Sequence, residues 1–209
     1  FWENSSERYP KLDKIRFCHQ LDFATSGLLL AAKSQKAAGA VGKLFKTREI
    51  SKQYMAIVYG HPKEDKWTIE APIGKDENDP KGFKMCVLEG AKDSITDFEV
   101  LQRGYYTVPG KAFGAEVSKV LVKPRTGRRH QIRVHLQQSG HPIVGDAAYA
   151  DDSDAFRMFL LAHKLYVPLK DRPLDLTVEP LHRSGSPSCS RHLSTTKPTL
   201  RTIPLLSEL

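Results

Sequence analysis

Asp22 is the residue whose setting most clearly points to chemistry. It lies in the stretch 19–27 (HQLDFATSG), which continues directly into the apolar stretch 28–32 (LLLAA). Asp22 stands alone between Leu21 and Phe23, so it is not part of a solvated run of charges. Charged side chains are seldom buried without a partner, which makes an acid in an apolar setting unusual. The pattern predicts a carboxylate at the edge of a core, on a turn that leads into a strand.

A cluster of cationic side chains lies where a turn is followed by a short helix. It comprises Arg125, Arg128, Arg129, His130, Arg133 and His135. Backbone N–H groups point outward at the start of a helix, so Arg128 and Arg129 can hold a phosphate together with them. The cluster therefore predicts a phosphate-binding site.

Arg133 differs from the other arginines because it is in line with Ile132 and Leu136 and is expected to point towards the core. A buried arginine requires a carboxylate partner, because an unpaired charge costs several kcal/mol. Asp22 is the natural candidate. Pairing with another acid, or extension of the side chain to solvent, remains open.

Tyr54 lies on a predicted strand over 52–60 (KQYMAIVYG), where residues of high β-propensity alternate between two faces. We expect further strands over 27–33, 67–73, 83–88, 94–102, 115–123 and 158–168, and a turn into a short strand over 141–146. Helices are predicted over 35–47, with Ser34 as N-cap, and over 131–138. Many strands with two helices indicate an α+β fold with a mostly antiparallel or mixed sheet.

Composition favours a polyanionic partner without requiring one. The 209-residue chain has 32 Lys and Arg against 24 Asp and Glu, a formal charge of +8. Nucleic acid is such a partner, but many basic proteins lack one, and the lysines of the helix over 35–47 also fit an ordinary wet surface. Cys18, Cys86 and Cys189 are far apart, which favours a reducing compartment over disulfides. We expect a cytoplasmic or nuclear protein, with the mitochondrion left open.

Other classes of site fit the sequence poorly. His130 and His135 are five residues apart and interleaved with arginines, which repel a metal ion. Asp22 has no second carboxylate in a comparable setting, as a glycosidase would need. The chain has no G-x-S-x-G, G-x-G-x-x-G or G-K-[ST] motif, and no apolar run long enough to span a membrane.

Three stretches resemble, in order and approximate spacing, the signatures of the RluA-type pseudouridine synthases. Residues 19–27 resemble H-R-L-D-x-x-T-S-G, and residues 52–60 resemble K-x-Y-x-A-x-V-x-G. Residues 126–135 (TGRRHQIRVH), followed by 140–146 (GHPIVGD), resemble the third signature. The resemblance covers residues 15–168.

The resemblance implies the pseudouridine synthase fold, with a long, mixed, mostly antiparallel sheet and a central catalytic cleft. It implies isomerisation of uridine to pseudouridine in RNA, without metal or cofactor. Asp22 would be the catalytic carboxylate, kept ionised by Arg133, and Tyr54 would stack on the uracil and help remove the C5 proton. The target nucleotide would flip into the pocket.

The predicted partner is RNA, whether tRNA, rRNA or mRNA, and the chain is expected to act as a monomer away from membranes. The residues expected to contact RNA are Gln20, Lys52, Arg125, Arg128, Arg129 and His130. The catalytic domain is expected over residues 1–183, followed by a Ser/Pro-rich disordered tail over 184–209. The aromatic pair Phe1-Trp2 suggests a cut inside a longer protein.

Two departures from the family keep alternatives open. Gln20 stands where the family usually has an arginine that helps displace the target base, and the opening K-P-x-G strand is absent. An RNA-binding protein with the same fold but weak or lost catalysis is therefore the alternative to an active synthase. A protein-interaction module has only the Ser/Pro-rich tail in its favour.

Overall fold

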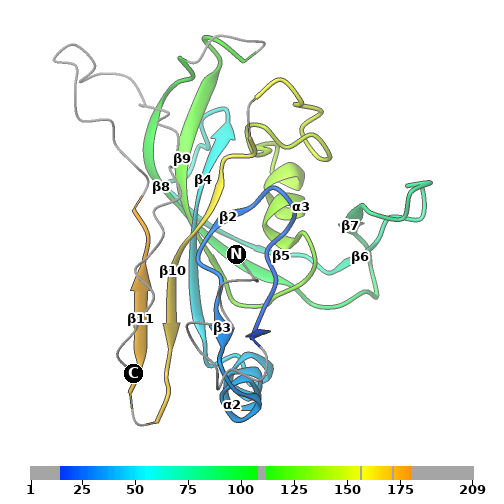
Figure 1. Ribbon diagram of the computed structural model, residues 1–209. Helices are drawn as coiled ribbons and strands as arrows, with labels where there is room; N and C mark the ends of the chain where they lie inside the picture. Colours follow the sequence, from blue (N-terminus) through cyan, green and yellow to red (C-terminus); the bar gives the residue numbers. More distant parts are fainter. Residues whose placement is uncertain (1–14, 108–111, 156, 171, 180–209) are drawn as a thin grey trace, which may run out of the picture.

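A seven-stranded sheet forms the centre of the computed structural model, which describes residues 15–107, 112–155, 157–170 and 172–179 (Figure 1). The predicted tail over 184–209 lies outside these residues. The strands run, in spatial order, β11 (Leu174–Thr177), β10 (Leu160–Val167), β4 (Ser51–Tyr59), β9 (Glu116–Pro124), β8 (Ile95–Tyr105) and β5 (Lys66–Glu70), with the short β2 (Ser26–Gly27) also on β10.

The predicted α+β fold with a mixed, mostly antiparallel sheet is confirmed. Only β2 and β10 run parallel among the described pairings of this sheet. The helix α3 (Gln131–Gln138) packs on one face of the sheet through Ile132 and Leu136, which join Ala56, Val58 and Val120 in the main core. Tyr54 shares this face, because side chains two apart in a strand point the same way.

The second helix, α2 (Gln35–Lys46), begins where predicted. The backbone N–H of Ala37 donates to the Ser34 side chain at 3.2 Å, which satisfies one of the free donors of the first turn. Val41 is buried and packs with Leu28 and Leu165 in a second core. The lysines of α2, Lys36, Lys43 and Lys46, are exposed.

Three expectations for local structure were wrong. The stretch 27–33 is not one strand: β2 follows β10, and the chain then leaves to form β3 (Ala31–Ala32) against β1 (Arg16–Phe17). The stretch 67–73 divides into β5 and β6 (Ile73–Lys75), because Pro72 has no N–H for a continuous ladder. The expected strand over 141–146 is a single bridge between Val58 and Ile143, and β11 was not predicted.

A separate hairpin projects beside α3 and consists of β6 and β7 (Met85–Val87) (Figure 1). Its Ile73 packs with Val134 of α3 and with Tyr149. The hairpin thus widens the surface around the N-terminal end of α3. No helix within the described residues is long and apolar enough to cross a membrane.

Candidate active site

Asp22 opens a tight turn that is tied to the central sheet. The Thr25 N–H donates to the Asp22 carbonyl oxygen at 2.9 Å, so Phe23 and Ala24 form the corner. Ala24 packs against the main core, and Ser26–Gly27 then pairs with Leu161 and Ala162 of β10. Asp22 is therefore held four residues from a strand at the middle of the fold.

Gly27 is required for this anchorage. Its φ is +110°, and a Cβ built on it would lie 2.3 Å from the carbonyl oxygen of Ala162. Only glycine adopts this backbone conformation at low cost and allows so close an approach. The final glycine of the stretch 19–27 thus has a structural explanation.

Arg133 contacts two acids. Its Nε donates to Oδ2 of Asp146 at 2.7 Å and its Nη2 donates to Oδ1 at 2.8 Å, whereas its Nη1 lies 3.6 Å from Oδ2 of Asp22. The side chains of Arg133 and Asp146 are 9% and 0% exposed, and that of Asp22 is 27% exposed. The buried pair with Asp146 fixes the guanidinium, and Asp22 shares its free edge.

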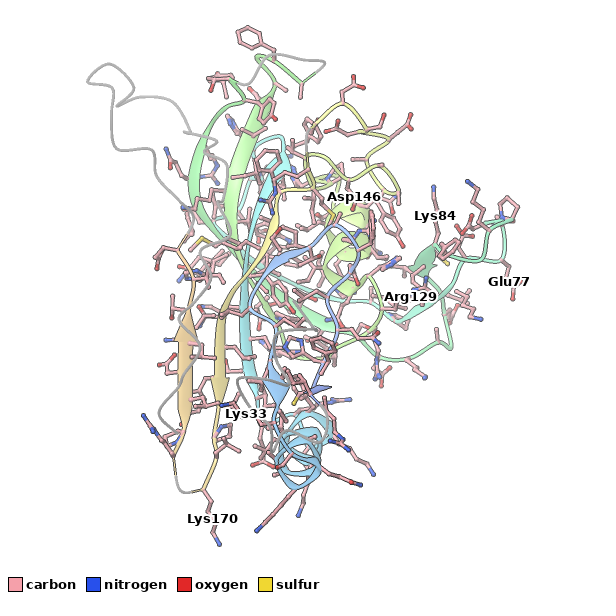
Figure 2. The ribbon with its side chains drawn as sticks, viewed as in Figure 1. Lys33, Glu77, Lys84, Arg129, Asp146 and Lys170 are labelled. Carbon is pink, nitrogen blue, oxygen red and sulfur yellow. The ribbon has the colours of Figure 1, made fainter. Side chains whose placement is uncertain are left out.

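Asp146 was not among the predicted site residues. It ends the stretch 140–146 as an acid after Ile143 and Val144, which is the one signal in the sequence that could have identified it. Its Oδ1 also accepts from the backbone N–H groups of Ala148 and Tyr149, at 3.0 and 3.1 Å. Figure 2 shows Asp146 beside α3.

Tyr149, which was also not among the predicted site residues, connects three elements of the site. Its ring lies under the guanidinium of Arg133, 4.7 Å from the ring centroid to Cζ. Its hydroxyl accepts from the N–H of Met85 at 2.8 Å and forms a hydrogen bond of 2.7 Å with Nδ1 of His130. The β6–β7 hairpin, α3 and the loop after Asp146 are thereby tied together.

Tyr54 lies close enough to Asp22 to be affected by its charge. Burial, and then the Asp22 carboxylate, raise the pKa of Tyr54 to about 12. At pH 7 roughly one molecule in 10⁵ would carry the phenolate, from the difference of about five units. The neutral phenol is therefore the form present beside Asp22.

Lys52 lies near the loop of the arginine cluster and acts on His19 at the start of the stretch 19–27. A Cβ added to Gly127 would be 3.3 Å from its Nζ, and its charge acts on the ring of His19, whose pKa is lowered by burial and also by Lys52. Burial lowers the pKa of Lys52, which forms no ion pair with any residue that the structure describes. A half-buried ammonium without an acid partner among the described residues is suited to an anionic ligand.

Three polar residues of the third signature, Thr126, Gln131 and His135, form buried hydrogen bonds that hold α3 in place. Nε2 of His135 lies 3.1 Å from the Ala71 carbonyl oxygen and so carries the hydrogen, which leaves Nδ1 to accept from Thr96 at 2.9 Å. Thr96 in turn accepts from the amide of Gln131 at 2.9 Å, and Gln131 accepts from Thr126 at 2.8 Å. This buried chain fixes α3 on β8, so that Arg133 is aimed at the two acids.

Among the other residues expected to bind RNA, some are exposed and others are held by hydrogen bonds within the protein. Gln20 and Arg129 are exposed, Arg129 lies over the ring of Phe83, and Figure 2 shows Arg129 on the side where the hairpin projects. Arg128 donates from Nε to the Asp93 carbonyl oxygen at 3.1 Å. Arg125 is instead paired with Asp97, to which its Nε and Nη2 each donate at 2.7 Å.

Comparison with known proteins gives the same interpretation as the three signatures. The model of the family described as RNA pseudouridylate synthase matches residues 1–138. The chain belongs to this family. Mouse RNA pseudouridylate synthase domain-containing protein 1 is 42% identical over 205 residues, which are 91% of this chain and 65% of the mouse protein.

A bacterial relative and a solved structure extend the comparison. The dual-specificity RNA pseudouridine synthase RluA of Vibrio vulnificus is 40% identical over 155 residues, 74% of this chain and 58% of that protein. The solved structure of human RNA pseudouridylate synthase domain containing 1 superposes with a TM-score of 0.73 at 40% identity, over 83% of this chain and 71% of that one. The predicted pseudouridine synthase fold is thereby confirmed. The chain thus spans less than two thirds of the mouse and bacterial relatives.

Proposed function

We propose that this protein isomerises uridine to pseudouridine in RNA. Family membership supports the reaction, and the arrangement of Asp22, Arg133 and Tyr54 supports the site. The observation that carries the proposal is the position of the Asp22 carboxylate, 3.6 Å from a guanidinium that Asp146 holds in place. A guanidinium held in this way gives the carboxylate a fixed neighbour of opposite charge.

In the proposed reaction, the bond between N1 of uracil and C1′ of ribose breaks and a bond from C5 to C1′ forms. The uracil turns between these steps. The proton on C5 leaves to solvent and N1, freed from the ribose, takes up a proton, so that product and substrate have the same composition. Asp22 acts on the ribose, either as nucleophile or in proton removal. No cofactor is required by this balance.

Tyr54 is proposed to stack on the uracil and to assist removal of the C5 proton. Because the pKa of Tyr54 is raised to about 12, its hydroxyl is protonated at neutral pH. It can accept the C5 proton only if it passes its own proton on, and the nearby Asp22 carboxylate is a suitable acceptor. Stacking needs no ionisation and is retained by phenylalanine.

The experiment that tests the proposal is tritium release from cellular RNA labelled at C5 of uridine. The wild-type chain should release tritium, and Asp22→Ala should abolish release. Tyr54→Phe should retain RNA binding but release tritium more slowly. Release by Asp22→Ala at the wild-type rate would contradict the assigned mechanism.

A second candidate function is RNA binding with weak catalysis, favoured by Gln20 in the position where the family usually has arginine. Binding of RNA without tritium release from any RNA would support it. Two further proposals concern the whole protein: that it acts as a monomer, and that it is cytoplasmic or nuclear. Light scattering of the purified protein and fractionation of cells test them separately.

A further inference from the structure

Phe23 is the most exposed large apolar side chain among the described residues, at 107% of the reference area. It lies directly after Asp22 in the corner of the turn. Ala24 faces the core and the Asp22 carboxylate faces Arg133, so the ring at the corner projects into solvent. A fully exposed phenylalanine gains nothing from burial in the folded chain, which makes it a candidate for contact with a ligand.

The backbone under Phe23 is fixed on both sides. The turn is closed by the hydrogen bond from Thr25 to Asp22, and the next residue, Ser26, already pairs with β10. In addition, the guanidinium of Arg157 donates to the Ser26 side chain. A ring on a rigid turn loses little conformational freedom on binding, which favours its use as a stacking surface.

The charges around the turn identify the partner. Lys52 lies near Gly127, in the loop that carries Arg128 and Arg129, and its charge acts on His19, three residues before the turn. These three cationic side chains provide positive charge for a nucleic-acid backbone. An aromatic ring beside a cationic surface is the combination that binds single-stranded or distorted RNA. Gln20, three residues before Phe23, supplies neither a ring nor a charge.

We infer that Phe23 stacks on the base next to the target uridine and fills the gap that this uridine leaves when it turns towards Asp22. Apolar side chains inserted between bases stabilise unstacked nucleic acid in this way. The inference rests on the proposed function and assigns to Phe23 the task of opening the RNA. Phe23 is a positioning residue in this scheme and Asp22 performs the chemistry.

Fluorescence gives a test that is independent of turnover. In Phe23→Trp the indole should be quenched by oligouridine of about 12 nucleotides, a length within the usual site size for single strands. Phe113→Trp is the matched control, since Phe113 is also exposed (65%). Phe113 lies near Glu116 at one end of β9, whereas Val122, which pairs with Tyr54, lies near the other end. Equal quenching in the two variants, or none in either, would overturn the inference.

Turnover gives the second test. Phe23→Ala should lower kcat/KM for tritium release roughly ten- to hundredfold, which corresponds to the loss of one stacked base. Its melting temperature and the salt dependence of RNA binding should not change, and Phe23→Trp should keep most of the activity. An unchanged kcat/KM in Phe23→Ala would refute the role, whereas an inactive wild-type chain would contradict the proposed function instead.

Discussion

Arg133 and Asp146 form a bidentate ion pair, with N–O distances of 2.7 and 2.8 Å, in which neither side chain is more than 9% exposed. Asp22 approaches the same guanidinium from the solvent side at 3.6 Å. One acid therefore fixes the arginine and the other is available for chemistry. This division has a measurable consequence for stability.

Removal of Asp146 should destabilise the protein far more than removal of Asp22. Asp146→Ala leaves a buried guanidinium without its main partner, and we expect a loss of about 3 kcal/mol in the free energy of unfolding. Asp22→Ala leaves the bidentate pair intact and should cost less than about 1 kcal/mol. Urea denaturation of both variants measures this, and equal losses would contradict the assignment of the two acids.

Gly27→Ala should prevent the Asp22 turn from docking on β10. The added Cβ meets a backbone oxygen at 2.3 Å and the residue has φ +110°, so we expect a loss of about 3 kcal/mol in the free energy of unfolding. Gly39→Ala is the control, because nothing lies within 4 Å of a Cβ at Gly39 inside α2. That substitution should stabilise the chain by about 0.5–1 kcal/mol, and a stable Gly27→Ala would rule out the proposed anchorage.

Stability should fall as the pH is lowered below about 6.5. Burial lowers the pKa of His19, His130 and His135, so the unfolded chain takes up protons at a higher pH than the folded chain does. The contribution of these histidines is complete above the ordinary pKa of 6.5 and is lost as the pH falls through their lowered values. Unfolding at pH 7.5 and pH 5.5 measures the slope.

The same measurement on His135→Gln isolates one residue. The variant should be less stable at both pH values, because the hydrogen bonds by which His135 joins Ala71 to Thr96 are lost. Its loss of stability between pH 7.5 and pH 5.5 should be smaller than that of the wild type. An identical loss would mean that His135 does not contribute to the pH dependence.

Arg128 and Arg125 should differ in their contribution to RNA binding. Arg128→Ala should weaken binding and reduce the slope of log K against log salt by about one, as expected for one lost phosphate contact. Arg125→Ala should change this slope less, because Arg125 is already paired with Asp97. Titrations with oligouridine at several salt concentrations test the pair, and the reverse order would contradict this assignment.

Sequence patterns predicted the elements with a strong period or a clear boundary. The helix over 131–138 has the predicted limits, and β4 differs from the predicted 52–60 by one residue at each end. The stretch 27–33 was wrong because an apolar run does not reveal which partner strands it meets. β2 and β3 pair with different strands, and only the tertiary structure determines where the run divides.

The part of the site that could be predicted from the sequence is the pairing of a buried arginine with an acid. A buried Arg133 had to have an acid, and the sequence offered Asp22 without identifying the closer partner, Asp146. Tyr149 carried no signal, since an exposed tyrosine and one under a guanidinium look alike in a sequence. The structural role of His135 was also hidden, because its partners Thr96 and Ala71 belong to distant segments.

The pairing of β2 with β10 joins Ser26 and Gly27 to Leu161 and Ala162, across most of the described chain. A ribosome-bound fragment that ends at residue 138 would contain Asp22, Tyr54 and Arg133, yet would have neither the strand that carries the Asp22 turn nor the acid that orients Arg133. The nascent protein therefore cannot assemble this site until residues near 162 have emerged. Contacts of such long sequence separation form slowly, so RNA met during synthesis encounters an incomplete site.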